Sequence, residues 1–203
     1  MIAIITGDII NSEKSDASEW INILKNQFSK WGESPADWEI YRGDEFQIRI
    51  PFNKALKAAI LIKALVKSYK DLDVRMAIGI GAESFTGTSV SESNGTAFLN
   101  SGRMFEGLKK EKRNLAIVTE DPNINETFDV MLKLALDFMD EWTVVSAEIV
   151  AMVLENPNAS QREIAEKLNI QQSAVSQRQK RARIDLVLEL LAYYTKALKR
   201  IKL

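Results

Sequence analysis

Short apolar runs alternate with amphipathic segments along the first part of the chain. The short runs have the length and the β-branched content of strands, and they cover residues 2–10, 38–50, 74–81 and 115–118. The segments between them repeat apolar residues at helical spacing, and they cover residues 17–31, 55–69 and 95–112. A turn at Gly43 divides the run at 38–50 into a hairpin of two strands. This order predicts a ferredoxin-like βαββαβ unit, followed by one more helix and strand.

Beyond the Asp121-Pro122-Asn123 turn, every apolar pattern has a helical period. We predict helices over residues 127–142, 147–154, 161–168, 172–183 and 184–203. The expected fold class is therefore α/β in the broad sense, or α+β. The expected domains are an α/β domain at residues 1–121, a linker helix at 122–142 and an all-α domain at 143–203.

The composition is typical of a globular protein in water, with 46% hydrophobic and 27% charged residues among 203. The chain contains neither cysteine nor histidine. This excludes disulfides, Cys-ligated or His-ligated zinc and Ser-His-Asp catalysis, and we expect no zinc, haem or iron–sulfur cofactor. We expect a cytoplasmic protein without a membrane partner, because no apolar run could span a bilayer and no basic region precedes the first strand.

Acidic residues occupy two positions that the predicted topology brings together. Asp8 stands near the end of an apolar strand, where a charge needs a partner. Asp44 and Glu45 follow Gly43 at the hairpin turn. The first strand and the hairpin are neighbours in a βαββαβ unit, so Asp8 and Asp44 are expected to meet at one edge of the sheet. Taken alone, the hairpin acids would also fit an ordinary solvated turn.

Together with the backbone carbonyl of Ile9, these acids form an all-oxygen set that suits Mg²⁺ or Mn²⁺. The predicted metal ligands are Asp8, Asp44 and Glu45. A nucleotide is expected against the loop that leads into the first helix, and its predicted contacts are Ile9, Asn11, Ser12 and Arg42. If the site is catalytic, Asp8 and Asp44 hold the metal and Arg103 adds positive charge. The polar loop at residues 82–94 is expected near the same edge.

The segment Arg42-Gly43-Asp44-Glu45-Phe46 matches four of the five letters of the GGDEF motif, and Asp8 stands where that family has a first-strand aspartate. The N-terminal domain thus resembles the palm-like domains of class III nucleotide cyclases and GGDEF diguanylate cyclases. The resemblance implies a metal-dependent nucleotide site. Arg42 replaces the first glycine of the motif, and Asn100 and Arg103 are three positions apart where the cyclases have four. These departures argue against synthesis of cyclic di-GMP.

A second resemblance covers nearly the whole chain. The segments that carry it are Ile-Thr-Gly-Asp-Ile at 5–9, Arg-Gly-Asp-Glu-Phe-Gln at 42–47, Arg-Met-Ala-Ile-Gly-Ile-Gly at 75–81 and Gly-Thr-Ala-Phe at 95–98. They are similar to segments of the SatD family of small bacterial proteins. That resemblance implies the architecture described above and supplies no reaction.

The last third of the chain has the features of a helix-turn-helix. Ser160 and Glu163 have the spacing of a capping box at the start of one helix. Ala165 is small enough to let a second helix cross the first. Asn169 stands where such turns usually have glycine, and asparagine also tolerates the left-handed conformation.

The second of these helices, at residues 172–183, is expected to turn Val175 and Ala182 inward and its polar side chains outward. The predicted DNA contacts are Gln172, Ser173, Ser176, Gln177, Arg178, Lys180 and Arg181. Gln suits adenine, Arg suits guanine, and Lys and Ser suit phosphate. Residues 160–203 include ten basic and four acidic side chains, although the net charge of the chain is only −1. A helical hairpin with a solvated basic face, or a protein-binding module, is the alternative.

The last helix has apolar residues near heptad spacing, at Ile184, Leu188, Leu191, Leu198 and Ile201. This pattern fits a homodimer seam, which helix-turn-helix proteins commonly use, and it fits packing within one chain equally well.

The leading hypothesis is a DNA-binding transcriptional regulator whose cyclase-like domain senses a metal-bound nucleotide. The alternative is a Mg-dependent nucleotidyl cyclase or nucleotidyltransferase that uses the two carboxylates Asp8 and Asp44. A third reading is a catalytically degenerate palm that serves only as a scaffold. Base preference, operator sequence and oligomeric state are left open by these patterns.

Overall fold

The computed structural model describes residues 1–14 and 17–199. The strands are β1 (Ile2–Ile10), β2 (Trp38–Tyr41), β3 (Glu45–Ile50), β4 (Asp73–Gly81) and β5 (Leu115–Val118). The α-helices are α1 (Ala17–Ser29), α2 (Ala55–Lys67), α3 (Thr96–Glu111), α4 (Pro122–Met139), α5 (Val144–Glu155), α6 (Gln161–Leu168), α7 (Gln172–Ala182) and α8 (Ile184–Leu198). Strands and helices follow one another in the predicted order, so the mixed α and β class is confirmed. In the described part of the chain, no helix is both long and apolar enough to cross a membrane.

The strands form one sheet in the order β2-β3-β1-β4-β5. β1 pairs antiparallel with both β3 and β4, whereas β5 joins β4 in parallel. Most residues of β1 and β4 are buried, because helices cover both faces of the sheet at its centre. The register places Asp8 opposite Glu45 of β3 and opposite Arg75 of β4.

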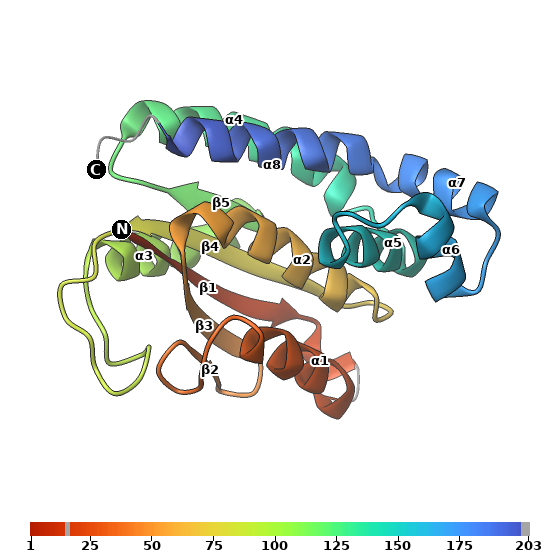
Figure 1. Ribbon diagram of the computed structural model, residues 1–203. Helices are drawn as coiled ribbons and strands as arrows, with labels where there is room; N and C mark the ends of the chain where they lie inside the picture. Colours follow the sequence, from red (N-terminus) through yellow and green to blue (C-terminus); the bar gives the residue numbers. More distant parts are fainter. Residues whose placement is uncertain (15–16, 200–203) are drawn as a thin grey trace.

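Helices α1 and α2 cover one face of the sheet, and α3 covers the other (Figure 1). α3 lies very close to β4: a Cβ atom on Gly79 would be 2.2 Å from the carbonyl oxygen of Ala97. A Cβ atom on Gly81 would be 2.8 Å from the amide nitrogen of Ala97. These glycines therefore permit close packing of helix on strand.

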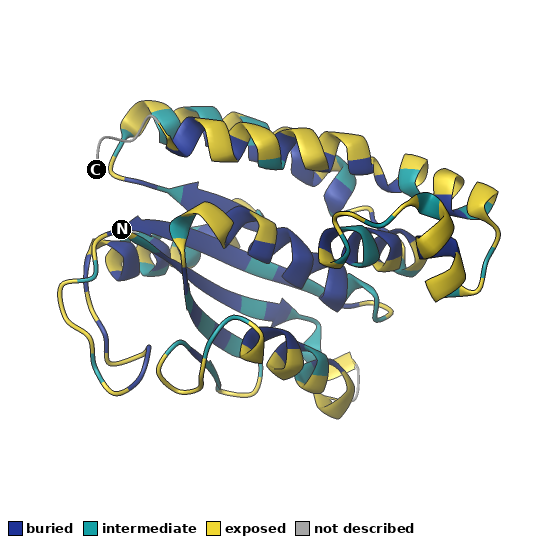
Figure 2. Cartoon of the chain, viewed as in Figure 1, coloured by how far each residue is buried: buried dark blue, intermediate teal, exposed yellow. Residues whose placement is uncertain are grey.

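Helices α4 and α8 lie side by side, and α5, α6 and α7 gather at one end of this pair (Figure 1). A single cluster of buried apolar residues runs from the α2 face of the sheet into α4, α5, α7 and α8. Figure 2 shows this interior beneath the exposed outer faces of α4 and α8. α4 begins five residues before its predicted start, because Asp121 caps it by accepting hydrogen bonds from the amides of Asn123 and Ile124.

The last helix uses its apolar face within the chain. The buried side chains of α8 are Ile184, Val187, Leu190, Tyr194, Ala197 and Leu198. The Tyr194 hydroxyl donates a hydrogen bond of 2.5 Å to the carbonyl oxygen of Phe52. Of the heptad positions, Leu188 is 47% exposed and Ile201 lies outside the described residues. Packing within the monomer is thus observed, and a dimer seam stays a prediction.

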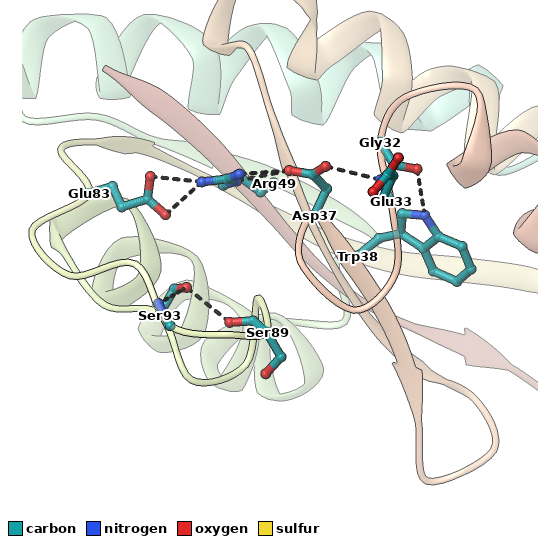
Figure 3. A network of polar contacts seen from close by, with 9 residues as sticks. Gly32, Glu33, Asp37, Trp38, Arg49, Glu83, Ser89 and Ser93 are labelled. Atoms are coloured by element: carbon teal, nitrogen blue, oxygen red, sulfur yellow. Dashed lines mark hydrogen bonds and ion pairs between the residues drawn. The ribbon is translucent and has the colours of Figure 1, made fainter.

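The polar loop at residues 82–95 leaves the sheet at the end opposite to Asp8. Gly81 pairs with Ile2 at the start of β1, because β1 and β4 are antiparallel. The prediction that this loop lies at the Asp8 edge is therefore wrong. Arg49 of β3 holds the loop instead: its guanidinium lies 3.0 Å from Glu83 and 2.8 Å from Asp37 (Figure 3).

Candidate functional site

The carboxylate of Asp8 lies on the α3 face of the sheet, beside a cation of the next strand. Arg75 Nη1 is 3.1 Å from Asp8 Oδ2. The other carboxylate oxygen, Asp8 Oδ1, and the Nε atom of Arg75 are buried and have no hydrogen-bond partner among the described residues. Burying an ion pair with unpartnered polar atoms is energetically costly. Asp8 Oδ1 can therefore still bind a cation or accept a hydrogen bond from a donor.

The pKa of the Asp8 carboxyl depends on its burial and on four nearby charges. Burial raises the pKa of Asp8 above the usual value, and the nearby carboxylates of Asp44 and Glu45 raise it further. The cations of Arg75 and Lys109 oppose that increase. The structure thus gathers three acids and two bases near the end of the central strand β1.

Asp44 lies beside the end of β1. Its carbonyl oxygen accepts a hydrogen bond of 3.1 Å from the amide of Ile9, and its carboxylate accepts one of 2.9 Å from the Ser12 hydroxyl. Asp44 thus contacts Ile9 and Ser12, whereas its expected meeting with Asp8 is seen only as an electrostatic effect of the one carboxylate on the other. Among the described residues, however, no group of three or more acidic side chains is arranged to hold a metal ion.

The hairpin owes its shape to two left-handed residues. Arg42 has φ 52° and Gly43 has φ 87°. A Cβ atom on Gly43 would have no neighbour within 4 Å in the described part of the chain, so the glycine is needed for its backbone angle and not for space. The side chain of Arg42 is 81% exposed, and its Nη1 is 3.9 Å from Glu45 Oε2.

Two other predicted residues point elsewhere. Asn11 donates a hydrogen bond to the carbonyl oxygen of Asp71. Arg103 is exposed on α3, whose sheet-facing residues include Ser101 and Leu108. Asn100, its neighbour in the cyclase comparison, donates to the carbonyl oxygen of Ile80.

Several polar residues of the site were missed by the sequence reasoning. Gln47 Nε2 donates to Thr6 Oγ1 at 3.3 Å, and Thr6 donates to Ser101 Oγ at 3.1 Å. This polar chain crosses from β3 over β1 to α3, next to Asp8. A signal for Arg75 was present, since it is the one basic residue in the apolar run at 74–81. Lys109 gave no such signal, because charged residues are usual on an exposed helix face.

The second candidate surface belongs to α6 and α7. Ser160 and Glu163 form the complete capping box that the sequence predicts. Asn169 adopts the left-handed conformation with φ 51°, and Ala165 is 5% exposed where the helices meet. α5 also packs against α7, so the two helices are part of a three-helix unit.

α7 turns its apolar residues inward as expected, with Val175 and Ala182 fully buried. The exposed residues of the predicted DNA-contact set are Gln172, Ser173, Ser176, Gln177, Lys180 and Arg181. Arg178 is the exception: it is half-buried, and its Nη1 lies 3.9 Å from Glu148 Oε2 on α5. Gln172 Nε2 also donates to Gln161 Oε1, which links the two helices.

Both candidate sites lie within one family match. The model of the SatD family matches residues 1–195, from β1 into α8. The chain belongs to the SatD family. The SatD match thus spans the Asp8 edge of the sheet as well as α6 and α7. No match was found among the curated proteins or among the solved structures.

Proposed function

We propose that this SatD-family protein is a DNA-binding transcriptional regulator in which α5, α6 and α7 form the helix-turn-helix. The exposed face of α7 carries the proposal, because it presents amides, hydroxyls and cations without any acidic residue from Gln172 to Arg183. Such a face can contact base edges and phosphates together. α7 enters the major groove, and α6 crosses the backbone beside it.

The two halves of α7 carry side chains suited to different parts of DNA. Gln172, Ser173, Ser176 and Gln177 lie in its first half and are exposed, so they are placed to read base edges. Lys180 and Arg181 lie in the last turn, where their charge attracts phosphates. Arg178 has to leave Glu148 before it can reach DNA, so it contributes less than its charge suggests.

The N-terminal part, with its ferredoxin-like strand order, is proposed as a cyclase-like sensing domain. Asp8 and Asp44 would hold Mg²⁺ or Mn²⁺ with a nucleotide, because Asp8 Oδ1 has no partner in the described residues and the donors are all oxygen. The metal would supply charge that neutralises phosphate oxygens. Lys109 adds a cation on the same face. The domain limits of 1–121, 122–142 and 143–203 belong to this proposal.

DNA binding is tested by selecting genomic fragments with the purified full-length protein and then measuring affinity at several salt concentrations. The logarithm of the association constant should fall linearly with that of the salt concentration. The double variant Lys180→Ala and Arg181→Ala should bind more weakly and lower the salt slope by about one unit per lost phosphate contact.

The matched control is Lys25→Ala with Lys110→Ala, because both lysines are exposed on helices outside α5–α7. This control should bind DNA as the wild type does. Absence of any selected fragment at low salt, or equal losses in the two double variants, would contradict the proposal.

A second candidate function is catalysis at Asp8. Its raised pKa and its unpartnered carboxylate oxygen are features that active-site residues commonly have. A nucleotidyl cyclase or nucleotidyltransferase would form a phosphodiester bond and release pyrophosphate from a nucleoside triphosphate. We therefore expect any activity with Mg²⁺ or Mn²⁺ to disappear in Asp44→Asn. Nucleotide binding by calorimetry without pyrophosphate release would favour a sensing domain, and the absence of both would favour a scaffold.

A further inference from the structure

A cleft lies between α5 and the two helices α1 and α2, which cover one face of the sheet. It has a volume of about 400 Å³ and is lined by the end of α1, the start of α2 and the end of α5. Its lining residues are Gln27, Lys30, Trp31, Ile50, Lys54, Lys57, Ala58, Leu61, Leu154 and Glu155. Cavities of this size and mixed lining are typical of small-molecule sites.

The cleft is separate from the carboxylate site. Ile50, at its wall, pairs with Ala3 at the beginning of β1, whereas Asp8 pairs with Glu45. The two sites therefore lie at opposite ends of the β1–β3 ladder.

The walls of the cleft combine unused positive charge with an apolar surface. Lys30 is paired with Glu155 at 2.9 Å and donates to Gln27 Oε1 at 3.0 Å. By contrast, the ammonium groups of Lys54 and Lys57 have no hydrogen-bond or ion-pair partner in the described part of the chain. The cleft is thus lined by two cations, Lys54 and Lys57, that no anion of the described residues neutralises.

A polar donor and a flat ring complete the lining. Gln27 is only 4% exposed, and its amide Nε2 has no acceptor among the described residues while its oxygen is held by Lys30. Gln27 lines the cleft and its Nε2 is not among the buried atoms without a partner, so this amide is open to solvent there and can donate to a ligand. Trp31 stacks on Phe28 with ring centroids 6.0 Å apart, and Leu154 provides an apolar wall from α5.

We propose that this cleft binds a small organic anion, a molecule with one flat apolar ring system and one carboxylate, sulfonate or phosphate group. The ring lies against Trp31 and Leu154, and the anionic group meets Lys54 and Lys57. Such a ligand contacts α1, α2 and α5 together, and so reaches the helix that leads into α6 and α7. The proposal is independent of DNA binding.

The test uses 8-anilinonaphthalene-1-sulfonate as the probe, titrated into the folded full-length protein and followed by fluorescence. The uncharged analogue N-phenyl-1-naphthylamine measures the apolar contribution alone. The variant Lys54→Gln with Lys57→Gln should weaken binding of the sulfonate by about tenfold and leave the amine unchanged. The matched control is Lys25→Gln with Lys110→Gln, which removes two exposed lysines outside the cleft and should bind both probes as the wild type does.

Circular dichroism verifies that both double variants are folded, as expected for exposed lysines that have no partner among the described residues. Saturable binding of the sulfonate that weakens only in the cleft variant supports the proposal. No saturable binding, or equal affinity in the cleft variant and the wild type, overturns it. Equal affinity is also the result expected if the probe binds the apolar groove lined by Leu134 and Tyr193 between α4 and α8.

Discussion

Asp8 and Arg75 face each other across β1 and β4, with Arg75 Nη1 3.1 Å from Asp8 Oδ2. Each also has a buried polar atom without a partner among the described residues. This pair lies near the end of β1, where the hairpin brings Asp44, so its properties determine how the proposed metal–nucleotide site behaves with pH.

The pH dependence of stability tests the surroundings of Asp8. Folding raises the pKa of Asp8 from 3.8, so the folded chain keeps this proton at pH values where the unfolded chain loses it. The free energy of unfolding contributed by Asp8 therefore falls as the pH rises through the folded pKa. Asp8→Asn does not titrate, so the stability of this variant relative to the wild type should increase with pH. Urea unfolding from about pH 4 to 7, in buffer with a chelator, measures this difference.

Glu106→Gln is the control for that experiment, because Glu106 is exposed on α3. Replacing this exposed side chain should change stability by less than about 0.5 kcal/mol at each pH measured. Parallel pH profiles for Asp8→Asn and the wild type would contradict a raised pKa for Asp8.

Lys63 is fully buried between two carboxylates. Its ammonium lies 2.6 Å from Asp73 of β4 and 2.6 Å from Asp140, which follows α4. Lys63→Met should lower the free energy of unfolding by about 1–3 kcal/mol, because the partly buried carboxylates of Asp73 and Asp140 lose their shared cation. Denaturant unfolding checks this value. Lys57→Met, on the exposed side of the same helix, should change stability by less than about 0.5 kcal/mol, and a similar loss in both variants would contradict the role of the cluster.

The close packing of α3 on the sheet depends on Gly79. Gly79→Ala would place a methyl group 2.2 Å from the carbonyl oxygen of Ala97, so the helix has to move. We expect a loss of about 2–3 kcal/mol in the free energy of unfolding. The control is Gly102→Ala within α3, where a Cβ atom meets nothing within 4 Å. That variant should gain up to about 1 kcal/mol from helix propensity, and thermal unfolding distinguishes the two signs.

The hydrogen bond of Tyr194 tests the packing of α8 within the chain. Tyr194 is 1% exposed, and burial raises its pKa well above the usual value. Tyr194→Phe should cost about 1 kcal/mol, since the Phe52 carbonyl loses its donor. The adjacent Tyr193 is 37% exposed, and Tyr193→Phe should have little effect. Equal stability of the two variants by urea unfolding would argue against this contact in solution.

Local patterns were sufficient for the elements and for several side-chain roles. The strands and helices appear in the predicted order, and the capping box at Ser160 and the left-handed Asn169 occur where expected. These features depend on neighbouring residues alone, because caps, turns and periodicity are properties of a few consecutive positions. The inward placement of Val175 and Ala182 followed from helical spacing in the same way.

Contacts of polar side chains between distant segments could not be inferred from the sequence as well as the strands, helices and caps could. Lys109 acts on Asp8 from α3, whereas Arg103 of the same helix is not among the charges that act on Asp8, although both side chains are exposed. Asn11 turns toward Asp71, and Arg178 turns toward Glu148. The side of the sheet at which the loop 82–95 begins was decided by the antiparallel pairing of β1 with β4.

The sequence by itself determined the order of strands and helices, the chemistry left by the absence of cysteine and histidine, and the acids near the hairpin. Only the tertiary structure decided that Arg75 pairs with Asp8, that Lys63 is buried between two acids, and that Lys54 and Lys57 border a cleft. The physical reason is that periodicity specifies which face of an element is apolar. The choice of partner for a polar side chain depends instead on strand register and helix packing, which involve residues far apart in the chain.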